Sequence, residues 1–147
     1  VELGEVGRYG YHNLPLYWSE PDRLPFLLKF RQKLAGFAFV KRGPGVTREE
    51  CVWDMAEFFV LRRYRRCGVG TEAARQVWKR LPGRWEIRVM ESNEAAYRFW
   101  ARAIATVLNE TISPVRTEIG DQPWHVFSFA TGNDCQPHIV ASTGISA

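Results

Sequence analysis

The chain has 147 residues, of which 46% are hydrophobic and 24% are charged, a composition typical of globular domains that excludes the disordered and coiled-coil classes. The net charge of +4 and a pI near 9.2 raise the question of nucleic-acid binding. Four arginines lie together within residues 62–66, whereas the other basic residues are interspersed with acidic ones. A local anion site therefore fits better than an extended nucleic-acid surface, and we disfavour a nucleic-acid partner.

The length predicts a single domain over residues 1–130, followed by a flexible C-terminal tail over residues 131–147. No apolar run is long enough to span a membrane, and the N-terminus lacks the features of a signal peptide. We therefore expect a cytoplasmic protein without membrane contact. The three cysteines, Cys51, Cys67 and Cys135, are far apart and cannot all pair, which predicts reduced thiols and no metal site.

The first half of the chain is predicted to form strands. Residues 8–18 are aromatic and interrupted by proline, which is typical of an irregular or edge strand. Two nearly continuous apolar segments, 25–30 and 34–40, predict a hairpin, and residues 52–61 predict a third strand. The intervening segment 41–50 contains glycines and a proline and is predicted to be a loop.

The second half alternates between helices and strands. Apolar residues at helical spacing predict a helix over residues 70–81 and another over 94–107, the second capped by Ser92 or Asn93. A strand at 84–90 separates them, and a terminal hairpin follows at 113–119 and 124–130. The strand-helix-strand step implies a parallel pair between antiparallel ones, so we expect an α/β fold with a mixed sheet of about six strands flanked by helices.

The connection between the third strand and the first helix is the most informative segment. Gly68 and Gly70 permit positive φ angles and leave no Cβ in the way of a ligand. Successive backbone N–H groups can then point into one concavity at the positive end of the helix, which predicts a pyrophosphate cradle assisted by the neighbouring arginines. A tight turn with solvated arginines is the alternative. A Walker A loop is excluded by sequence, and Ala73 replaces the third glycine of a dinucleotide-binding motif.

Two short motifs resemble those of the GNAT acyltransferase superfamily. Residues 65–70, Arg-Arg-Cys-Gly-Val-Gly, resemble its Q/R-x-x-G-x-G/A signature, and residues 93–100, Asn-Glu-Ala-Ala-Tyr-Arg-Phe-Trp, resemble its N-x-x-A-x-x-F-Y motif. Both lie in the expected elements, and the resemblance extends over roughly residues 8–130. It implies acetyl-CoA as the acyl donor and a sheet that splays apart between the strands at 52–61 and 84–90.

The resemblance also implies which residues contact the cofactor. The pyrophosphate is expected at the cradle, formed by Arg65, Arg66, Cys67, Gly68, Val69, Gly70 and Thr71. The pantetheine arm is expected along the end of the preceding strand, at Phe59, Val60 and Leu61. Asn93 matches an asparagine that lies beside the arm in the family, although a role as helix cap explains it equally well.

Acyl transfer to an amine needs a base, an oxyanion donor and a proton for the departing thiolate. We favour Glu57 as the base because it interrupts an apolar strand, where burial raises a carboxyl pKa, over Asp54, which alternation places on the opposite strand face. Water or another residue is the remaining alternative. Backbone N–H groups near Val60 and Leu61 are candidates to polarise the thioester carbonyl.

The general acid departs from the family pattern. The family often has a tyrosine at the last position of the second motif, but this chain has Trp100, whose indole cannot release a proton at neutral pH. Tyr97 is one turn earlier and is expected to face elsewhere. A catalytically weak or inactive acyl-CoA-binding module is therefore the main alternative to an enzyme, and a nucleic-acid-binding protein is a third class.

Family members carry helices before the first hairpin, for which this sequence has little room. We expect either a fragment or a naturally shortened variant, with an open acceptor cleft or an apolar patch that a homodimer would cover. The resemblance predicts a primary amine on a small molecule as acceptor, but the sequence does not identify it.

Overall fold

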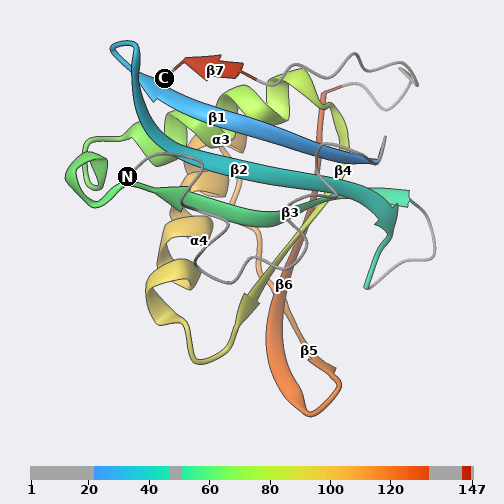
Figure 1. Ribbon diagram of the computed structural model, residues 1–147. Helices are drawn as coiled ribbons and strands as arrows, with labels where there is room; N and C mark the ends of the chain where they lie inside the picture. Colours follow the sequence, from blue (N-terminus) through green and yellow to red (C-terminus); the bar gives the residue numbers. More distant parts are fainter. Residues whose placement is uncertain (1–21, 47–50, 133–143, 147) are drawn as a thin grey trace.

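The computed structural model describes residues 22–46, 51–132 and 144–146 (Figure 1). Its strands are β1 (Arg23–Phe30), β2 (Lys33–Pro44), β3 (Cys51–Val60), β4 (Gly83–Met90), β5 (Val115–Ile119), β6 (Gln122–Thr131) and β7 (Gly144–Ser146). Two α-helices, α3 (Val69–Arg80) and α4 (Glu94–Leu108), and one 3₁₀-helix, η2 (Arg62–Tyr64), connect them. Among these residues no helix combines the length and apolar character needed to cross a membrane.

The strands form one mixed sheet in the order β5-β6-β4-β3-β2-β1-β7. Neighbouring strands are antiparallel except in two pairs, β3 with β4 and β1 with β7. The predicted α/β fold with a mixed sheet is confirmed. The seventh strand, β7, lies within the segment predicted to be a tail and pairs with β1; residues 133–143 of that segment and the predicted strand at 8–18 lie outside the described residues.

One boundary prediction is wrong. The segment 41–50 was expected to be a loop, but β2 continues to Pro44 because Lys41–Pro44 pair with the first residues of β3. A ladder partner supplies the backbone hydrogen bonds that a glycine-rich sequence does not predict, and Pro44 lies at the strand end, where its missing N–H is tolerated.

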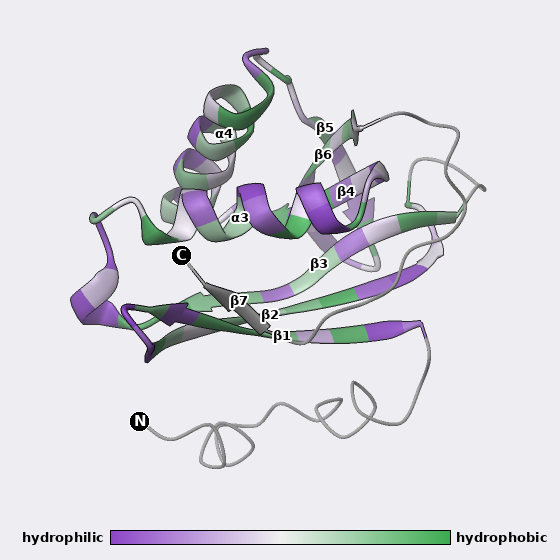
Figure 2. Ribbon diagram, turned by 90° about the horizontal axis from the view of Figure 1, so that it is seen from above, coloured by the Kyte–Doolittle hydropathy of each residue, from purple (hydrophilic) through white to green (hydrophobic). Residues whose placement is uncertain are grey.

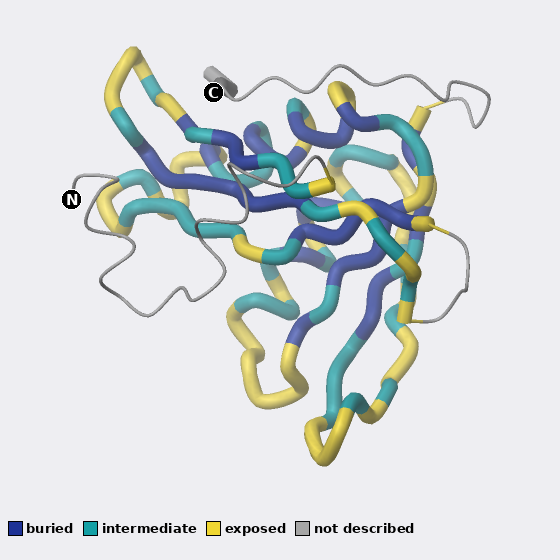
Figure 3. The backbone as a smooth tube through the Cα atoms, turned by 45° about the vertical axis from the view of Figure 1, so that its right-hand side comes forward, coloured by how far each residue is buried: buried dark blue, intermediate teal, exposed yellow. Residues whose placement is uncertain are grey.

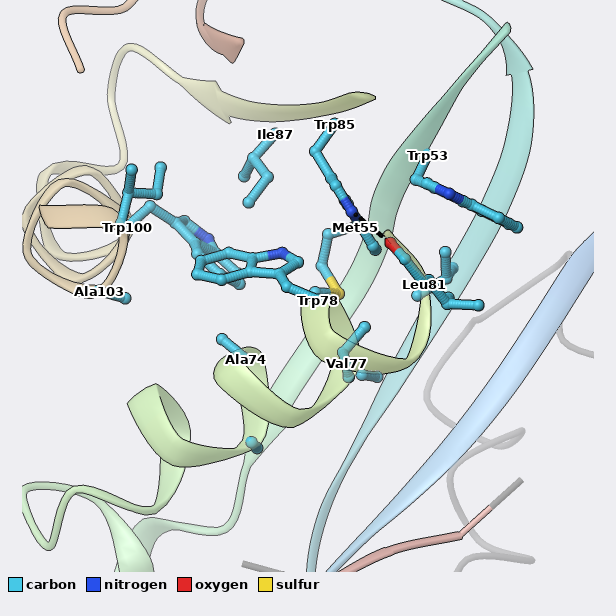
Figure 4. Close-up of a cluster of buried hydrophobic side chains, with 14 of the residues drawn as sticks. Trp53, Met55, Ala74, Val77, Trp78, Leu81, Trp85, Ile87, Trp100 and Ala103 are labelled. Carbon is cyan, nitrogen blue, oxygen red and sulfur yellow. Dashed lines mark hydrogen bonds between the residues drawn. The ribbon is translucent and has the colours of Figure 1, made fainter. Parts of the chain in front are cut away.

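Both α-helices cover the same face of the sheet, as Figure 2 shows from above. This helix-covered face carries Ala38 and Val40 of β2, Trp53 and Met55 of β3, and alternate residues of β4 beginning with Trp85. The resulting core is rich in aromatic residues from both helices and the sheet (Figure 4). The Trp85 indole N–H donates to the Leu81 carbonyl at 2.9 Å, which satisfies the one polar atom of a ring that is fully buried.

A β-bulge interrupts the ladder between β2 and β3. Phe39 pairs with Glu57 and the next residue, Val40, pairs with Met55, so Ala56 is an extra residue on β3. Side chains alternate between faces along a strand, and one inserted residue reverses the alternation beyond it. The bulge therefore decides which face each polar side chain of β3 occupies.

The sheet splays between its two parallel central strands. Only two residue pairs join β3 to β4, Trp53 with Trp85 and Asp54 with Glu86. Beyond them, β4 and its partners diverge from β1, β2 and β3 (Figure 1). Figure 3 shows that the buried stretches of backbone run through the interior, while the exposed ones lie mainly at the turns between elements. The gap opens at the carboxyl ends of the two parallel strands, where α/β folds place their ligands.

Candidate active site

The connection from β3 to α3 exposes a row of backbone amides. Arg66 and Gly68 both have positive φ, 66° and 77°, on either side of Cys67. Alternating conformations of this kind direct successive N–H groups into one concavity. Among the described residues, the amides of Arg66 through Thr71 donate to no protein acceptor, and α3 receives no side-chain cap. A non-glycine residue with positive φ is strained, which is common where backbone serves a ligand.

The two glycines of the cradle have different roles. The prediction of a positive φ holds for Gly68, where an added Cβ would meet nothing within 4 Å. It is wrong for Gly70, which lies inside α3 with helical φ. A Cβ on Gly70 would lie 2.9 Å from the Phe99 ring of α4, so this glycine permits close packing of the two helices.

The arginines of this connection are exposed, and two of them lie over aromatic rings. The guanidinium of Arg65 lies over the Phe59 ring at 5.6 Å, and its Nε donates to the Val60 carbonyl at 3.0 Å. Arg63 lies over Tyr64 at 5.0 Å. Such contacts orient the guanidiniums while leaving donors for an anion. Arg62, Arg63, Arg65 and Arg66 belong to no ion pair among the described residues.

The end of β3 presents backbone groups to the gap beside β4. Leu61 N–H donates to the Ala35 carbonyl at 2.6 Å, so the idea that this N–H polarises a thioester is wrong. Alternate residues of an antiparallel strand direct their backbone groups to opposite sides, and Val60 N–H therefore points away from β2, toward the gap. Val60 remains the candidate oxyanion donor, whereas the cofactor contacts predicted for Phe59 and Leu61 remain predictions.

Asp54 is a buried, ion-paired carboxylate at the junction where the sheet splays. Its Oδ2 accepts a hydrogen bond from Arg88 Nη2 of β4 at 2.8 Å, and Lys41 Nζ of β2 lies 3.9 Å away. Burial raises the pKa of the Asp54 carboxyl above its usual value, and the positive charges of Arg88 and Lys41 oppose that effect. Two cations in contact make Asp54 a poor candidate for a base that must accept a proton.

Glu57 lies on the same sheet face as Asp54, which corrects the expectation that alternation separates them. The extra residue Ala56 reverses the alternation, so both carboxylates occupy the face opposite the helices. Glu57 is exposed and forms no ion pair among the described residues. Packing around its carboxyl nevertheless raises the pKa of Glu57, and the negative charge of Asp54 raises it further.

The residues of the second motif lie in or just before α4. Asn93 is the N-cap, and its Oδ1 accepts from Ala96 N–H at 3.1 Å, so its role as a cap is established while a cofactor contact stays a prediction. Trp100 is buried in the core against Phe58, with ring centroids 4.9 Å apart. Tyr97 packs on His125 at 5.1 Å, which agrees with its expected orientation away from the site.

Sequence reasoning missed the cations beside Asp54. Arg88, Lys41 and the buried Glu86 all lie on the face opposite the helices. Alternation along β4 places Glu86 and Arg88 on the side opposite Trp85, Ile87 and Val89. Their proximity to Asp54 depended on the register of β3 with β4, which no local pattern specifies.

Comparison with known proteins identifies the architecture. The family model described as Acetyltransferase (GNAT) family matches residues 3–104. No match is found among curated proteins.

Solved structures with the same fold include two enzymes of different origin. Arabidopsis thaliana NAA60, solved with a bisubstrate analogue, is 19% identical at a TM-score of 0.50 over 67% of this chain. This chain spans 66% of the length of that protein. A GNAT-family acetyltransferase from Streptococcus pneumoniae is 17% identical at a TM-score of 0.50, with 81% of this chain and 72% of the other covered. At these identities the likeness concerns the fold.

Proposed function

This chain belongs to the acetyltransferase (GNAT) family, and on that premise we propose that it is an N-acetyltransferase that moves an acetyl group from acetyl-CoA directly to a primary amine. The observation that carries the proposal is the connection between β3 and α3. Its amides lack protein acceptors among the described residues, and it lies beside the gap between β3 and β4. Acetyl-CoA needs an anion cradle for its pyrophosphate and a slot for its arm, and the two features are adjacent.

The residues that would hold the cofactor follow from this arrangement. The amides of Arg66, Cys67, Gly68, Val69, Gly70 and Thr71 suit the pyrophosphate, and the arginines add charge. The edge of β3 at Phe59 to Leu61 suits the amide groups of the arm, and Asn93 is a further candidate contact. When bound, the cofactor supplies an activated acetyl thioester. Arabidopsis NAA60 has been solved with acetyl-CoA on the same fold, at 17% identity and a TM-score of 0.50.

Glu57 is the proposed general base. It is exposed on the face opposite the helices, lacks a cationic partner among the described residues, and has a raised pKa. A carboxylate of raised pKa accepts a proton from an ammonium group more readily, which leaves the amine free to attack. Asp54 supports this role through its negative charge, while its own contacts with Arg88 and Lys41 keep it from serving as the base.

The developing oxyanion is assigned to Val60 N–H, which points into the gap. Neither Trp100, buried in the core, nor Tyr97, packed on His125, is positioned as a general acid. Water is the remaining proton source for the thiolate. A thiol with a pKa of about 8.5 needs little assistance to depart, so this assignment is compatible with turnover.

Calorimetry with acetyl-CoA tests the cradle. Gly68→Ala forces a Cβ onto a residue with φ of 77° beside the exposed amides, and we expect at least a tenfold loss of affinity, about 1.4 kcal/mol. Gly120→Ala is the matched control, since Gly120 also has positive φ and open space but lies in the β5–β6 turn. Wild-type affinity in a folded Gly68→Ala protein would contradict the cradle. Thiol release with a panel of primary amines then tests catalysis.

A second candidate is a catalytically weak or inactive acyl-CoA-binding module. The buried Trp100 at the family's tyrosine position favours it. Protection of the fold by CoA without thiol release for any amine would support the module over the enzyme.

We further propose that the chain acts as a single domain in the cytoplasm on a small-molecule amine, possesses no metal site, and can form a homodimer. Sedimentation of the purified protein tests the last point. Retention of a constant monomer mass up to high concentration would exclude the dimer.

A further inference from the structure

The face of the sheet opposite the helices carries both signs of charge beside the gap. Glu57 contributes an exposed carboxylate, and Lys41 of β2 and Arg88 of β4 contribute two cations that meet at the neighbouring Asp54 on the same face. Asp54 and Glu86 lie on the same face but are buried, 7% and 2% exposed. A molecule approaching this face therefore meets one carboxylate and two ammonium or guanidinium groups.

The two cations retain unused donors. Arg88 donates from Nη2 to Asp54, and this is its one hydrogen bond among the described residues, although a guanidinium has five N–H donors. Lys41 Nζ lies 3.9 Å from Asp54, which is an ion pair beyond hydrogen-bond length. Their side chains are 29% and 39% exposed, so both reach solvent.

We propose, on the basis of the proposed function, that the acceptor is an amine that also carries a carboxylate, with the carboxylate held by Arg88 and Lys41 while the amine lies at Glu57. The unused edge of a guanidinium fork matches a carboxylate, and a lysine ammonium adds a flexible second donor. A plain alkylamine would leave the donors that these two cations do not direct at Asp54 without a partner in the ligand.

The register sets the spacing of the two groups. Glu57 lies opposite Phe39 and Asp54 lies opposite Lys41, two residues further along β2, which is roughly 7 Å along the strand. An amine and a carboxylate separated by a short flexible chain match this backbone offset. Short ω-amino acids, such as γ-aminobutyrate, are therefore the class of acceptor that fits.

The test compares γ-aminobutyrate with its amide, γ-aminobutyramide, which keeps the amine and removes the negative charge. Calorimetry on the CoA-saturated wild-type protein is expected to give at least tenfold tighter binding of the acid, and thiol release from acetyl-CoA is expected to favour the acid by a similar factor in kcat/KM. Equal binding of the two, or tighter binding of the amide, overturns the inference.

Variants of Lys41 and Arg88 test whether these two cations bind the carboxylate of the acceptor. Lys41→Gln is expected to raise the KM for the acid, so that the ratio of kcat/KM for acid and amide falls toward one. Arg42→Gln is the matched control, because the neighbouring Arg42 lies on the helix-covered face over Trp53 at 4.9 Å and should leave the preference intact. Arg88→Lys keeps the charge beside buried Asp54 but removes the fork, and a several-fold loss of the preference is expected.

The two proposals fail in different ways. Preferential binding of the acid without thiol release for any amine would refute the transferase and leave the acceptor site standing. Turnover of acid and amide at equal rates, with equal binding, would refute the acceptor class and leave the transferase standing. A preference that survives in both Lys41→Gln and Arg88→Lys would also refute the assignment.

Discussion

The two connections that leave the parallel strands are built in opposite ways. The first, from β3 to α3, is long and basic, and its helix begins at Gly68 without a side-chain cap. The second, from β4 to α4, consists of Glu91, Ser92 and Asn93, and the Asn93 side chain caps its helix. Each helix follows the carboxyl end of one of the two parallel strands at the splay.

This difference leaves the N-terminus of one helix available to a ligand, whereas the N-terminus of the other is satisfied within the protein. A capped N-terminus with a glutamate in its first turn satisfies its own dipole, as α4 does with Asn93 and Glu94. An uncapped N-terminus surrounded by arginines instead attracts an external anion. In α3 the first-turn acid Glu72 is paired with Arg75, whose hydrogen bonds lower the pKa of Glu72 to about 2. The negative charge of Glu72 is therefore balanced by a neighbouring arginine.

The largest effect is predicted where β2 supports the first connection. A Cβ on Gly36 would meet the Phe59 carbonyl oxygen at 2.0 Å, and because that atom is backbone, the end of β3 must move. Gly36→Ala is expected to lower the free energy of unfolding by about 3 kcal/mol, measured by chemical denaturation. Gly43→Ala on the same strand is the control, since an added Cβ there meets nothing within 4 Å. An equal loss in both variants would contradict this explanation.

The second prediction places the same negative charge at each helix end. Thr71→Glu puts a carboxylate in the first turn of α3 and is expected to raise the Kd for acetyl-CoA about tenfold, through repulsion of the phosphates. The helix dipole favours the new charge, so the free energy of unfolding should stay equal or rise by up to about 1 kcal/mol. Ala95→Glu makes the matching change in α4 and should leave the Kd unchanged. Calorimetry measures the Kd for acetyl-CoA, and chemical denaturation measures the free energy of unfolding. A similar rise in Kd for both variants would contradict the assignment of the anion site to the N-terminus of α3 alone.

The sequence carried enough information for the architecture and for the location of the cradle. Helical and alternating periodicity identified both α-helices and the strands from β1 to β6 to within a few residues, because those patterns arise from which side of an element is buried. The short strand β7 and the 3₁₀-helix η2 carry no such pattern and were not predicted. Gly68 was recognisable because the residue after a strand and before a helix often needs a positive φ. The extension of β2 to Pro44 was not recognisable, since it depends on pairing with β3.

The arrangement of the carboxylates depended on information that no single segment contains. Alternation placed Asp54 and Glu57 on opposite faces, and the bulge at Ala56 overturned that inference. A bulge is defined by the pairing of two strands, so the sequence of one strand alone does not predict it. Gly70 shows the same limitation, because its contact is Phe99 on a helix that is distant in sequence.

The third prediction concerns the cap of the second connection. Asn93→Ala is expected to lower the free energy of unfolding by about 1 kcal/mol because the Ala96 N–H loses its acceptor. Ser92→Ala, at the neighbouring position that is also a plausible cap from sequence, should have little effect. The Kd for acetyl-CoA distinguishes the two roles of Asn93. An unchanged Kd limits Asn93 to capping, and a rise of several fold in a folded Asn93→Ala protein adds the contact with the cofactor arm.

The smallest predicted effect is a shift in the pH dependence of kcat/KM, caused by the carboxylates near the junction of β3 and β4. Glu57 acts as a base only when ionised, so kcat/KM should rise with pH through a pKa above the usual 4.5. Among the described residues, the charged groups on the same sheet face are Asp54 on β3, Lys41 on β2, and Glu86 and Arg88 on β4, and of these Asp54 raises the pKa of Glu57. Removing the negative charge in Asp54→Asn lowers the pKa of Glu57, and the acidic limb of the profile should therefore move to lower pH. Glu118→Gln, on the remote strand β5, should leave the limb in place. A limb that moves to higher pH in Asp54→Asn would contradict this assignment, because loss of the carboxylate and release of the cations beside it both favour ionised Glu57.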